Sequence, residues 1–561
     1  MSVKACRYNV AHMRSSLVSI VAIASSLIAF QYACAADTAA VTAEIHRSFT
    51  NVEHDDLVDA STEERDLVGA IYAKRQYRPL WNSDDQITKQ ARALVAILDG
   101  ANTYGLRPQD YGSAILQAEV SNVLGPSARP QQWAQFDVAL SIAAHRFLNH
   151  LHYGRVSPER AGFKLGTPHH DLDIEAQLEP LATADVVAFV AKTEPQFHHY
   201  ALLKQALAKY RRLAADPTLT RLPAFTERSI KPGQSYGGAE KLRALLLATG
   251  DLPSTTNVLS AGSTLDPALS TALGNFQRRH GLTIDGALGK QTYAALTTPL
   301  SVRVRQIELT LERWRWLPGF ESSPIIVNIP QFKLFAFANA DDREENFVQM
   351  DVIVGRSFPH TRTPVFTGDM KYVVFRPYWD VPYDIMKREM LAEIRKQPGY
   401  LESKHLEIVR GQTDAAAPVA PTPENIDELA AGRLRLRQRP GPDNALGAIK
   451  FILPNSYNVY LHSTPEHRLF SESRRTFSHG CIRVSDPVPL AQYVLRNQKD
   501  AWPRSRIEAA MDGAPATRVN LDKPIRVMIL YGTAVAADSG NVYFLDDVYG
   551  HDRKLEQLLG S

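Results

Sequence analysis

The chain has 561 residues, of which 44% are hydrophobic and 22% charged, and a formal net charge of +3. Domains usually run to about 100–200 residues, so this length predicts several domains rather than one hydrophobic core. The composition excludes a collagen, a wholly disordered chain and a polytopic membrane protein.

The N-terminal segment, residues 1–35, has the pattern of an export signal. It contains basic but no acidic residues, an apolar run over Ser15–Phe30, and small residues, Ala33 and Ala35, spaced as at a signal-peptidase site. An uncleaved signal anchor is the alternative. A lipid-modified Cys34 is less favoured, because bulky residues precede it where small or branched ones are wanted.

The charge of the remaining chain argues against nucleic acid as a partner. Residues 36–561 contain as many basic as acidic residues, which leaves no net charge for a broad basic face. After the signal, no stretch reaches 18 uninterrupted apolar residues, so a second membrane span is not expected.

Helical patterns dominate the first part of the exported chain. Residues 36–60 are polar and alanine-rich, which predicts a linker. A helix is predicted to begin at Ser61, because Glu64 follows at the spacing of a capping box. Similar stretches follow, one of them ending at Gly154, so we expect a helical domain over 61–228.

Residues 232–300 have the pattern of a small three-helix module. Leu269, Leu273 and Phe276 recur at helical spacing, and turn-forming residues separate this helix from the next. A generic helical linker domain is the alternative. The segment resembles the peptidoglycan-binding type 1 module, and the resemblance rests on Asp266-Pro267, Phe276-Gln277, Gly281-Leu282, Asp285-Gly286, Gly289 and Thr292.

After a predicted connector helix over 301–322, the sequence pattern changes from that of helices to that of strands. Short β-rich runs fill 323–505, which predicts a mainly-β domain. Residues 383–440 interrupt these runs with a helical start and a loose, proline-rich end, as expected of a capping insertion. Residues 506–561 should complete the β domain as strands and a short tail.

The cysteines single out one position. Cys6 and Cys34 lie in the signal, so Cys481 is the one thiol of the exported chain and has no internal disulfide partner. It lies in the sequence "FSHGCIRVSD". A thiol there can be a nucleophile, a metal ligand or an ordinary core residue.

The neighbours of Cys481 favour nucleophilic catalysis. In "YNVYLHS" the alternation of a strand puts Tyr460 and His462 on one face, 19 residues before the cysteine in the case of His462. A thiol is mostly protonated at neutral pH and needs a base, which His462 can supply. Gly480 would let a carbonyl approach, with the Cys481 N–H and the Tyr460 hydroxyl as oxyanion donors.

A zinc site is the competing interpretation. His462, His467, His479 and Cys481 could all be ligands. The sequence has no CxxC, no HExxH and no second thiol outside the signal, and His479 is only two residues from Cys481. We therefore expect no metal at this position.

The surrounding sequence resembles the L,D-transpeptidase (YkuD) catalytic domain. The family pattern is a strand histidine, a loop and then Ser/Thr-His-Gly-Cys, here His462, Ser478, His479, Gly480, Cys481, Ile482 and Arg483. "TRTPVFTGDMKYVVFRPYWDVP" and "DPVPLAQYVL" extend the resemblance to the large periplasmic L,D-transpeptidases of Gram-negative bacteria. Those are multidomain α + β proteins with a helical scaffold, a peptidoglycan-binding module and a mainly-β catalytic domain with a capping insertion.

The resemblance implies a periplasmic acyltransferase that acts on peptidoglycan. Cys481 would attack a donor tetrapeptide, release D-alanine and pass the acyl group to an amine, giving a 3→3 cross-link, with His462 moving the protons. Water as acceptor would make an L,D-carboxypeptidase, and another amine would attach a lipoprotein. A wall-binding protein without activity is disfavoured. Carbapenems would acylate the cysteine.

The resemblance also implies roles for neighbouring residues. His479 would shape the pocket or polarise the carbonyl. Arg483 would hold a substrate carboxylate or pair with Asp486. Ser478 and Trp379 are further substrate-binding candidates. No metal or organic cofactor is needed, peptidoglycan is the expected partner, and other cell-wall enzymes are compatible with it.

Overall fold

A computed structural model describes residues 38–51, 57–83, 86–123, 128–166, 172–253, 262–319, 323–337, 347–358, 361–413, 415–513 and 515–560. The predicted export signal lies outside these ranges. The described residues fall into two compact units, one within Met1–Arg155 and Asp171–Gln196, the other within Val156–His170 and Phe197–Ser561. Within the described ranges, no helix combines the length and apolar character that crossing a bilayer requires.

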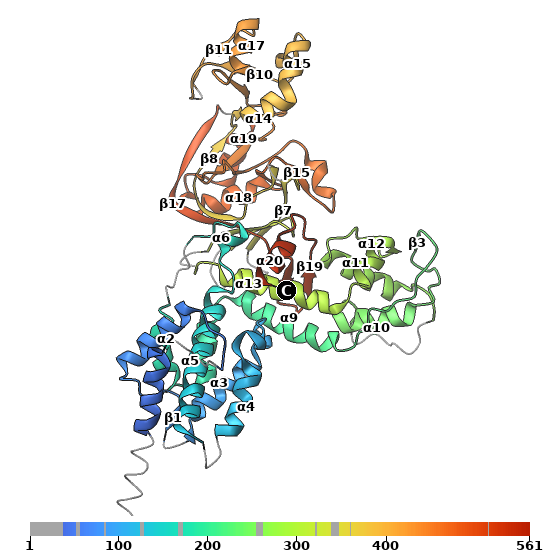
Figure 1. The fold of residues 1–561 in the computed structure, drawn as a ribbon. Helices are drawn as coiled ribbons and strands as arrows, with labels where there is room; N and C mark the ends of the chain where they lie inside the picture. Colours follow the sequence, from blue (N-terminus) through green and yellow to red (C-terminus); the bar gives the residue numbers. More distant parts are fainter. Residues whose placement is uncertain are drawn as a thin grey trace, which may run out of the picture. The chain divides into compact units, whose positions relative to one another are not determined.

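The first unit is a bundle of helices (Figure 1). It begins with a helix over 38–50. The other elements, in chain order, are α2 Thr62–Lys74, β1 Asn82–Ser83, β2 Gln86–Ile87, α3 Lys89–Asp99, η1 Ala101–Tyr104, η2 Pro108–Tyr111, α4 Ser113–Val123, α5 Pro130–Tyr153, η3 Glu175–Gln177, α7 Leu178–Leu181 and α8 Val186–Thr193.

Local sequence signals account for the start of α2. The Ser61 hydroxyl accepts from the Glu64 N–H at 3.2 Å, and the Glu64 carboxylate accepts from the Ser61 N–H at 2.9 Å. These bonds satisfy N–H groups that a helix start leaves unpaired. The predicted capping box is therefore confirmed.

The predicted linker over 36–60 is wrong for residues 38–50. Val41 and Ile45, four residues apart, are buried and join the hydrophobic cluster that contains Val68 and Tyr72. An apolar pair at this spacing lies on one helix face. Burial of that face stabilises a helix that the polar, alanine-rich composition of the segment did not indicate.

The second unit takes the last long helix of the predicted 61–228 domain. This helix is α9, His198–Ala214, whose buried face carries Tyr200, Leu203 and Leu207. It packs against α13, Leu300–Arg315, and against the hairpin formed by β18, Ala534–Ala536, and β19, Val542–Phe544. Its partners come from distant sequence, so a helical pattern alone did not show to which unit it belongs.

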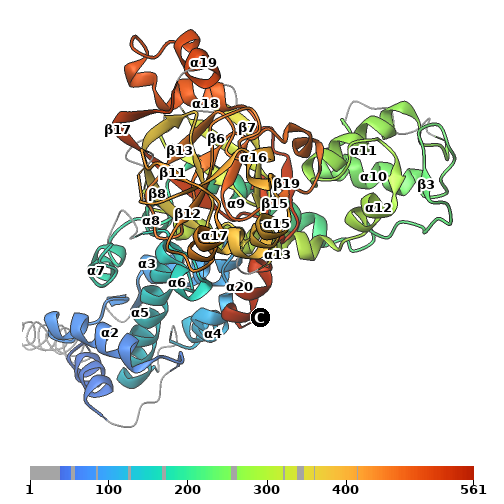
Figure 2. The ribbon, with the colours of Figure 1, turned by 90° about the horizontal axis from the view of Figure 1, so that it is seen from above.

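The module predicted over 232–300 has the expected helices, gathered beside β3 in Figure 2. Gln277 organises its turn, since its side-chain carbonyl accepts from the Asp285 and Gly286 N–H groups and its amide donates to the Thr292 hydroxyl. The elements are β3 Ser229–Ile230, α10 Ala239–Thr249, α11 Pro267–Arg279, β4 Leu288–Gly289 and α12 Lys290–Leu296.

The strands between residues 325 and 530 form, apart from the cap strands, one sheet that closes on itself. Its order is β15-β7-β16-β14-β13-β8-β17-β5-β6, and β6 also pairs with β7. Closure removes the edges that an open sheet would expose. The strands are β5 Ile325–Asn328, β6 Lys333–Phe337, β7 Phe347–Gly355, β8 Phe366–Phe375, β13 Ile449–Ile452, β14 Leu461–His462, β15 Thr476–Ser478, β16 Ile482–Val484 and β17 Thr517–Leu530.

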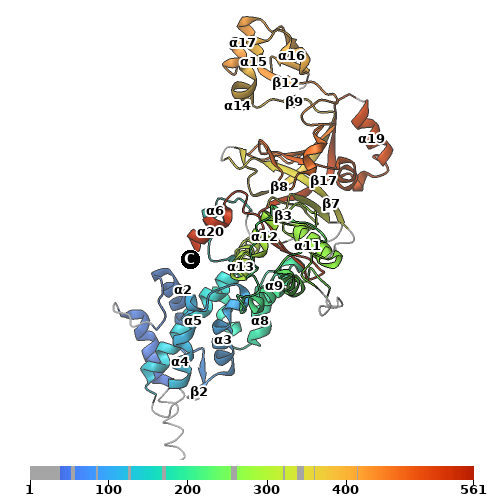
Figure 3. The same cartoon turned by 90° about the vertical axis from the view of Figure 1, so that its right-hand side faces the viewer.

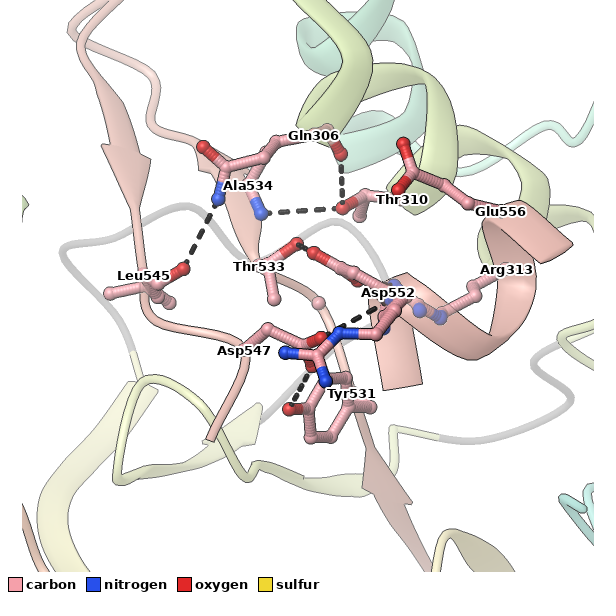
Figure 4. Close-up of polar contacts among 12 residues, drawn as sticks. Gln306, Thr310, Arg313, Tyr531, Thr533, Ala534, Leu545, Asp547, Asp552 and Glu556 are labelled. Atoms are coloured by element: carbon pink, nitrogen blue, oxygen red, sulfur yellow. Dashed lines mark hydrogen bonds and ion pairs between the residues drawn. The ribbon is translucent and has the colours of Figure 1, made fainter. Parts of the chain in front are cut away.

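The C-terminal segment contributes more than the predicted strands and tail. Its last element, α20, His551–Leu559, is a helix whose Asp552 accepts from Arg313 on α13 at 2.6 Å and from the Thr533 hydroxyl at 2.7 Å. Figure 4 shows these bonds beside the one from Gln306 to the Leu545 carbonyl. The remaining helices are α6 Pro158–Ala161, η7 His467–Ser471, α18 Pro487–Val494, η8 Arg496–Gln498 and α19 Arg504–Asp512.

The insertion over 383–440 and the strand β9 just before it form a folded subdomain, which we call the cap (Figure 3). It has its own core around Leu406, Leu429 and Leu436 and its own sheet in the order β11-β10-β12-β9. The proline-rich end, predicted to be loose, forms β11 and provides Thr422, the N-cap residue of α17. The elements are β9 Trp379–Asp380, α14 Tyr383–Ile385, η6 Met386–Met390, α15 Leu391–Lys396, α16 Tyr400–Ser403, β10 Leu406–Val409, β11 Pro418–Val419, α17 Pro423–Ala430 and β12 Arg435–Gln438.

The end of β7 depends on a glycine. A Cβ on Gly355 would lie 1.9 Å from the Thr361 carbonyl oxygen and 2.7 Å from the Thr363 nitrogen. Both are backbone atoms, so the chain itself would have to move. We expect Gly355→Ala to destabilise the fold by about 1–3 kcal/mol and to lower Tm in a thermal-unfolding measurement.

Gly513→Ala is the matched control. Gly513 has φ −130° and no atom within 4 Å of an added Cβ, so its substitution should leave Tm nearly unchanged. Equal Tm values for the two variants would contradict the close approach at Gly355.

Candidate active site

A short parallel pairing brings the predicted catalytic residues together. In β14 and β16, Leu461 lies opposite Ile482 and His462 opposite Arg483. The Ile482 N–H also donates to the Tyr460 carbonyl at 3.0 Å. Alternation along each strand therefore places Tyr460, His462 and Arg483 on one face, together with Cys481.

The strand that carries the histidine is shorter than the sequence predicted. The run "YNVYLHS" covers residues 457–463, but β14 spans only Leu461–His462. The chain bends before it, where Asn458 has φ +54°. The shared face was nonetheless predicted correctly, because the Tyr460 and His462 ring centroids are 5.7 Å apart.

His462 is held as a neutral imidazole. Its Nδ1 lies 2.6 Å from the Ser463 carbonyl oxygen, which can only accept, so Nδ1 carries the proton and Nε2 is left as the base. Only 4% of the residue is exposed. Burial, followed by the charge of Arg483, lowers the pKa of His462 to about 3.

Cys481 is a protonated thiol in the resting site. Burial raises the pKa of Cys481, and this effect outweighs the hydrogen bonds from Tyr460 and the charge of Arg483, which act in the opposite direction. The thiol donates to the Asn458 carbonyl at 3.7 Å. Because the thiol and the imidazole on this face are both neutral, the thiol must lose its proton during attack rather than start as a preformed ion pair.

Tyr460 is suited to donate a hydrogen bond. Burial, reinforced by Cys481 and Asp380, raises the pKa of Tyr460 well above its ordinary value. Its hydroxyl therefore keeps its proton at physiological pH. Such a donor beside the sulfur can stabilise negative charge that develops on a carbonyl oxygen.

The turn before Cys481 is braced from both sides. The Ser478 hydroxyl donates to the Cys481 carbonyl at 2.6 Å and accepts from the Gly480 N–H at 3.1 Å. Gly480 has φ +121°, a conformation that glycine adopts without strain. Ser478 is buried within this turn. Its predicted contact with substrate stays a prediction.

A second hydroxyl, missed in the sequence, holds this turn to β7. Thr363 donates to the Gly480 carbonyl at 2.8 Å and accepts from the Gly355 N–H at 2.9 Å. The Tyr549 hydroxyl completes the brace, donating to the Gly355 carbonyl at 2.6 Å. Thr363 lies in one of the stretches that carry the family resemblance, but nothing in its local pattern points to this role.

The cap contacts the catalytic turn directly. Nε2 of His479 lies 2.8 Å from a carboxylate oxygen of Glu389 on η6. Trp379 lies on β9 of the cap sheet, opposite Gln438, at the margin of the cap core. Its neighbour Asp380 is close enough to affect the pKa of Tyr460. His479 therefore links the catalytic turn to the cap, whereas Trp379 lies in the cap sheet.

Arg483 pairs with a carboxylate that the sequence did not indicate. Its guanidinium contacts Glu466, in the loop between β14 and β15, so the alternative of a salt bridge to Asp486 is wrong. Arg483 belongs to β16, whereas Asp486 follows the strand as the N-cap of α18. Among the residues described, no group of three His, Cys, Asp or Glu side chains could hold a metal ion.

Chemically, one sheet face carries a thiol, a neutral imidazole and a phenol donor, the groups that cysteine-dependent acyl transfer uses. Comparisons with known proteins agree. Residues 66–207 match the family model of a "Scaffold domain", 239–296 that of a "Putative peptidoglycan binding domain", and 323–520 that of the "L,D-transpeptidase catalytic domain".

A relative from Haemophilus influenzae, "Putative L,D-transpeptidase", is 31% identical over 251 residues. The match covers 45% of this chain and spans about half, 49%, of the relative. A crystal structure of a fused zinc-dependent amidase/peptidase/peptidoglycan-binding protein from Clostridium acetobutylicum covers 54% of this chain and 100% of its own. Its identity is 12% and its TM-score 0.14, too low to bear on the fold.

These matches confirm the resemblance drawn from the sequence. The chain combines a helical region, a small helical module and a β-rich region that match, in this order, a scaffold domain, a peptidoglycan-binding domain and the L,D-transpeptidase catalytic domain. The multidomain α + β fold class is confirmed with it.

The resting state of the thiol can be measured by alkylation. Because the pKa of Cys481 lies above the ordinary thiol value of 9.0, its rate of reaction with iodoacetamide should keep rising through that pH. Peptide-level mass spectrometry separates Cys481 from other thiols, and His462→Gln should give a profile of the same shape. A reactive plateau below neutral pH, lost in His462→Gln, would instead reveal a thiolate–imidazolium pair.

Proposed function

We propose that this protein is an exported L,D-transpeptidase that forms 3→3 cross-links in peptidoglycan through a thioester on Cys481. The observation that carries the proposal is the shared sheet face of Tyr460, His462 and Cys481 within a segment that matches the L,D-transpeptidase catalytic domain. The pattern of residues 1–35 supports export to the periplasm, by a cleaved signal or a retained anchor.

The first half of the reaction acylates the enzyme. Cys481 attacks the carbonyl carbon of the third residue of a donor tetrapeptide, and the thiol proton passes to Nε2 of His462. Negative charge on the carbonyl oxygen is met by the Tyr460 hydroxyl and the Cys481 N–H. The bond to D-alanine breaks, the leaving amine takes the proton from His462, and a thioester remains.

The second half transfers the acyl group. The side-chain amine of a diaminopimelate on a neighbouring stem attacks the thioester carbon, and His462 accepts a proton from this amine. The carbon–sulfur bond breaks, the sulfur takes the proton, and an amide joins the two stems. No step needs a metal or an organic cofactor.

The cap is proposed to cover the donor peptide while it reacts. The support is the Glu389–His479 contact and the position of Asp380 near Tyr460. His479 would then polarise or orient the substrate carbonyl, with Arg483 and Trp379 as candidates for binding its polar and apolar parts. A covered site protects a thioester from water.

The reaction is tested with purified protein and disaccharide-tetrapeptide. We expect mass spectrometry to detect cross-linked dimers and free D-alanine, and Cys481→Ser to abolish both while retaining the parent Tm. Meropenem should add one mass adduct to the parent, mapped to Cys481, and none to the variant.

The products distinguish the alternatives. Tripeptide without dimer would identify an L,D-carboxypeptidase, and cross-linking by Cys481→Ser at the parent rate would refute the thioester. Inclusion of a chelator serves as a control, since activity lost to it and restored by zinc would support the metal interpretation.

The cap contact is tested by Glu389→Ala. Both partners are partly exposed, so the loss of stability should stay below about 1 kcal/mol, whereas KM for the donor should rise. Glu393→Ala, on α15 of the same cap, is the matched control because its carboxylate pairs with Gln397 instead. An unchanged KM in Glu389→Ala would argue against the cap as a lid.

A further inference from the structure

A large cavity lies away from Cys481, between the peptidoglycan-binding module and the catalytic sheet. Its volume is about 1030 Å³, at the upper end of the range of ligand pockets in proteins. Cys481, His462 and Tyr460 are not among its lining residues. It is therefore a separate site, lined by the module, by the catalytic sheet and also by α9 and the β18–β19 hairpin.

The catalytic wall is the outward face of β5, β6 and β7. Burial alternates along β6, so that Leu334 and Ala336 lie in the core while Lys333, Phe335 and Phe337 face the cavity. The Phe335 and Phe337 rings lie nearly parallel, with centroids 6.4 Å apart. An outward sheet face usually carries polar side chains. Here the Phe337 ring also meets His199 of α9, with centroids 6.2 Å apart, so this part of the cavity lining is aromatic.

The opposite wall belongs to the module. Leu282, Thr283 and Ile284 follow its central helix, and Gln291 lies on α12. Ile284 is 53% exposed, so its apolar side chain is accessible on the cavity wall. The cavity thus has apolar side chains on both sides and polar ones beside them.

Buried contacts hold the module wall in place. Arg279, at the end of α11, pairs with Asp251 at 2.5 Å and donates to the Val542 carbonyl on β19 at 2.8 Å. α11 lies beside β19 in Figures 1 and 2. The Phe544 ring of the same hairpin packs on Tyr210 of α9. A wall fixed by a buried ion pair keeps its shape when empty, which lowers the cost of binding.

The charges of the lining favour an anionic ligand. Five lining residues are arginine or lysine and three are aspartate or glutamate. Two of the cations, Arg278 on the module and Arg474 on the catalytic domain, are exposed on opposite walls. Aromatic faces accept sugar rings, and guanidinium groups bind carboxylates.

We propose that this cavity binds a stretch of peptidoglycan glycan strand, with sugar rings against Phe335, Phe337 and Ile284 and stem-peptide carboxylates against Arg278 and Arg474. This inference rests on the proposed function, because it names a second contact for the same substrate. One wall belongs to the domain that matches a peptidoglycan-binding family and the other to the domain that matches the transpeptidases. A ligand that carries sugar rings and carboxylates matches the apolar and the cationic side chains of both walls.

The position of the cavity gives the bound strand a route to the catalytic turn. Ser471–Arg475 line the cavity, and the chain then runs through β15 to His479 and Cys481. β15 pairs with β7, whose Gln349 and Asp351 also line the cavity. A glycan strand bound here would lie against the segment of the chain that leads into the catalytic turn.

The test measures binding in full-length Cys481→Ala protein, so that it does not depend on turnover. The probe is a long, uncross-linked glycan strand bearing tetrapeptides. Ile284→Glu changes the module wall and Arg474→Glu the catalytic wall. Each should raise Kd roughly tenfold, and added salt should weaken binding by the parent.

Matched controls lie outside the cavity. Val302→Glu replaces another exposed branched residue, 47% exposed on α13, and Lys499→Glu reverses an exposed charge on the catalytic domain. Both should retain the parent Kd, and all variants should retain the parent Tm.

The outcomes separate this inference from the proposed function. Unchanged Kd in both cavity variants overturns the inference, and so does a change confined to Ile284→Glu, which would mean that the module binds alone. Turnover of disaccharide-tetrapeptide by the parent enzyme is measured separately. Its absence would refute the transpeptidase while leaving the binding result to stand.

Discussion

The chemistry of this protein depends on two short strands that run in parallel, β14 and β16. Their register places a histidine and a tyrosine from one segment on the same face as a cysteine that follows a 19-residue interval. A slip by one residue would turn every one of these side chains to the other face. The closed sheet around them makes such a slip costly, since β16 is also paired with β7 and β14 with β13.

The backbone around the cysteine is held by hydroxyl groups rather than by charges. Ser478, Thr363 and Tyr549 form a continuous brace from the turn to the end of β7. Neutral bonds of this kind fix geometry without altering the protonation of thiol or imidazole. Two cations lower the pKa of His462: Arg483, which is itself paired with Glu466, and Lys450, which lies opposite His462 on β13. Positioning and electrostatics are thus supplied by different residues.

Much of the architecture could be predicted because its signals are local. The capping box joins Ser61 to Glu64, and the turn residues of the module lie within ten residues of Gln277. The motif that ends at Cys481 is equally short. Contacts between distant segments could not be predicted. Thr363 meets Gly480 across 117 residues, the helix over 38–50 is stabilised by burial against α2, and the cap core gathers residues from a segment with little periodicity.

The protonated state of the thiol has a consequence for durability. We propose that the protein works in an oxidising compartment, where a thiolate would be consumed by peroxide or captured in mixed disulfides. Both reactions need the deprotonated sulfur, and burial keeps the pKa of Cys481 high. Residues 36–561 contain a single cysteine, so they offer no second thiol that could restore an oxidised sulfur. Keeping the sulfur protonated until substrate arrives therefore slows the oxidative ageing of the protein between turnovers.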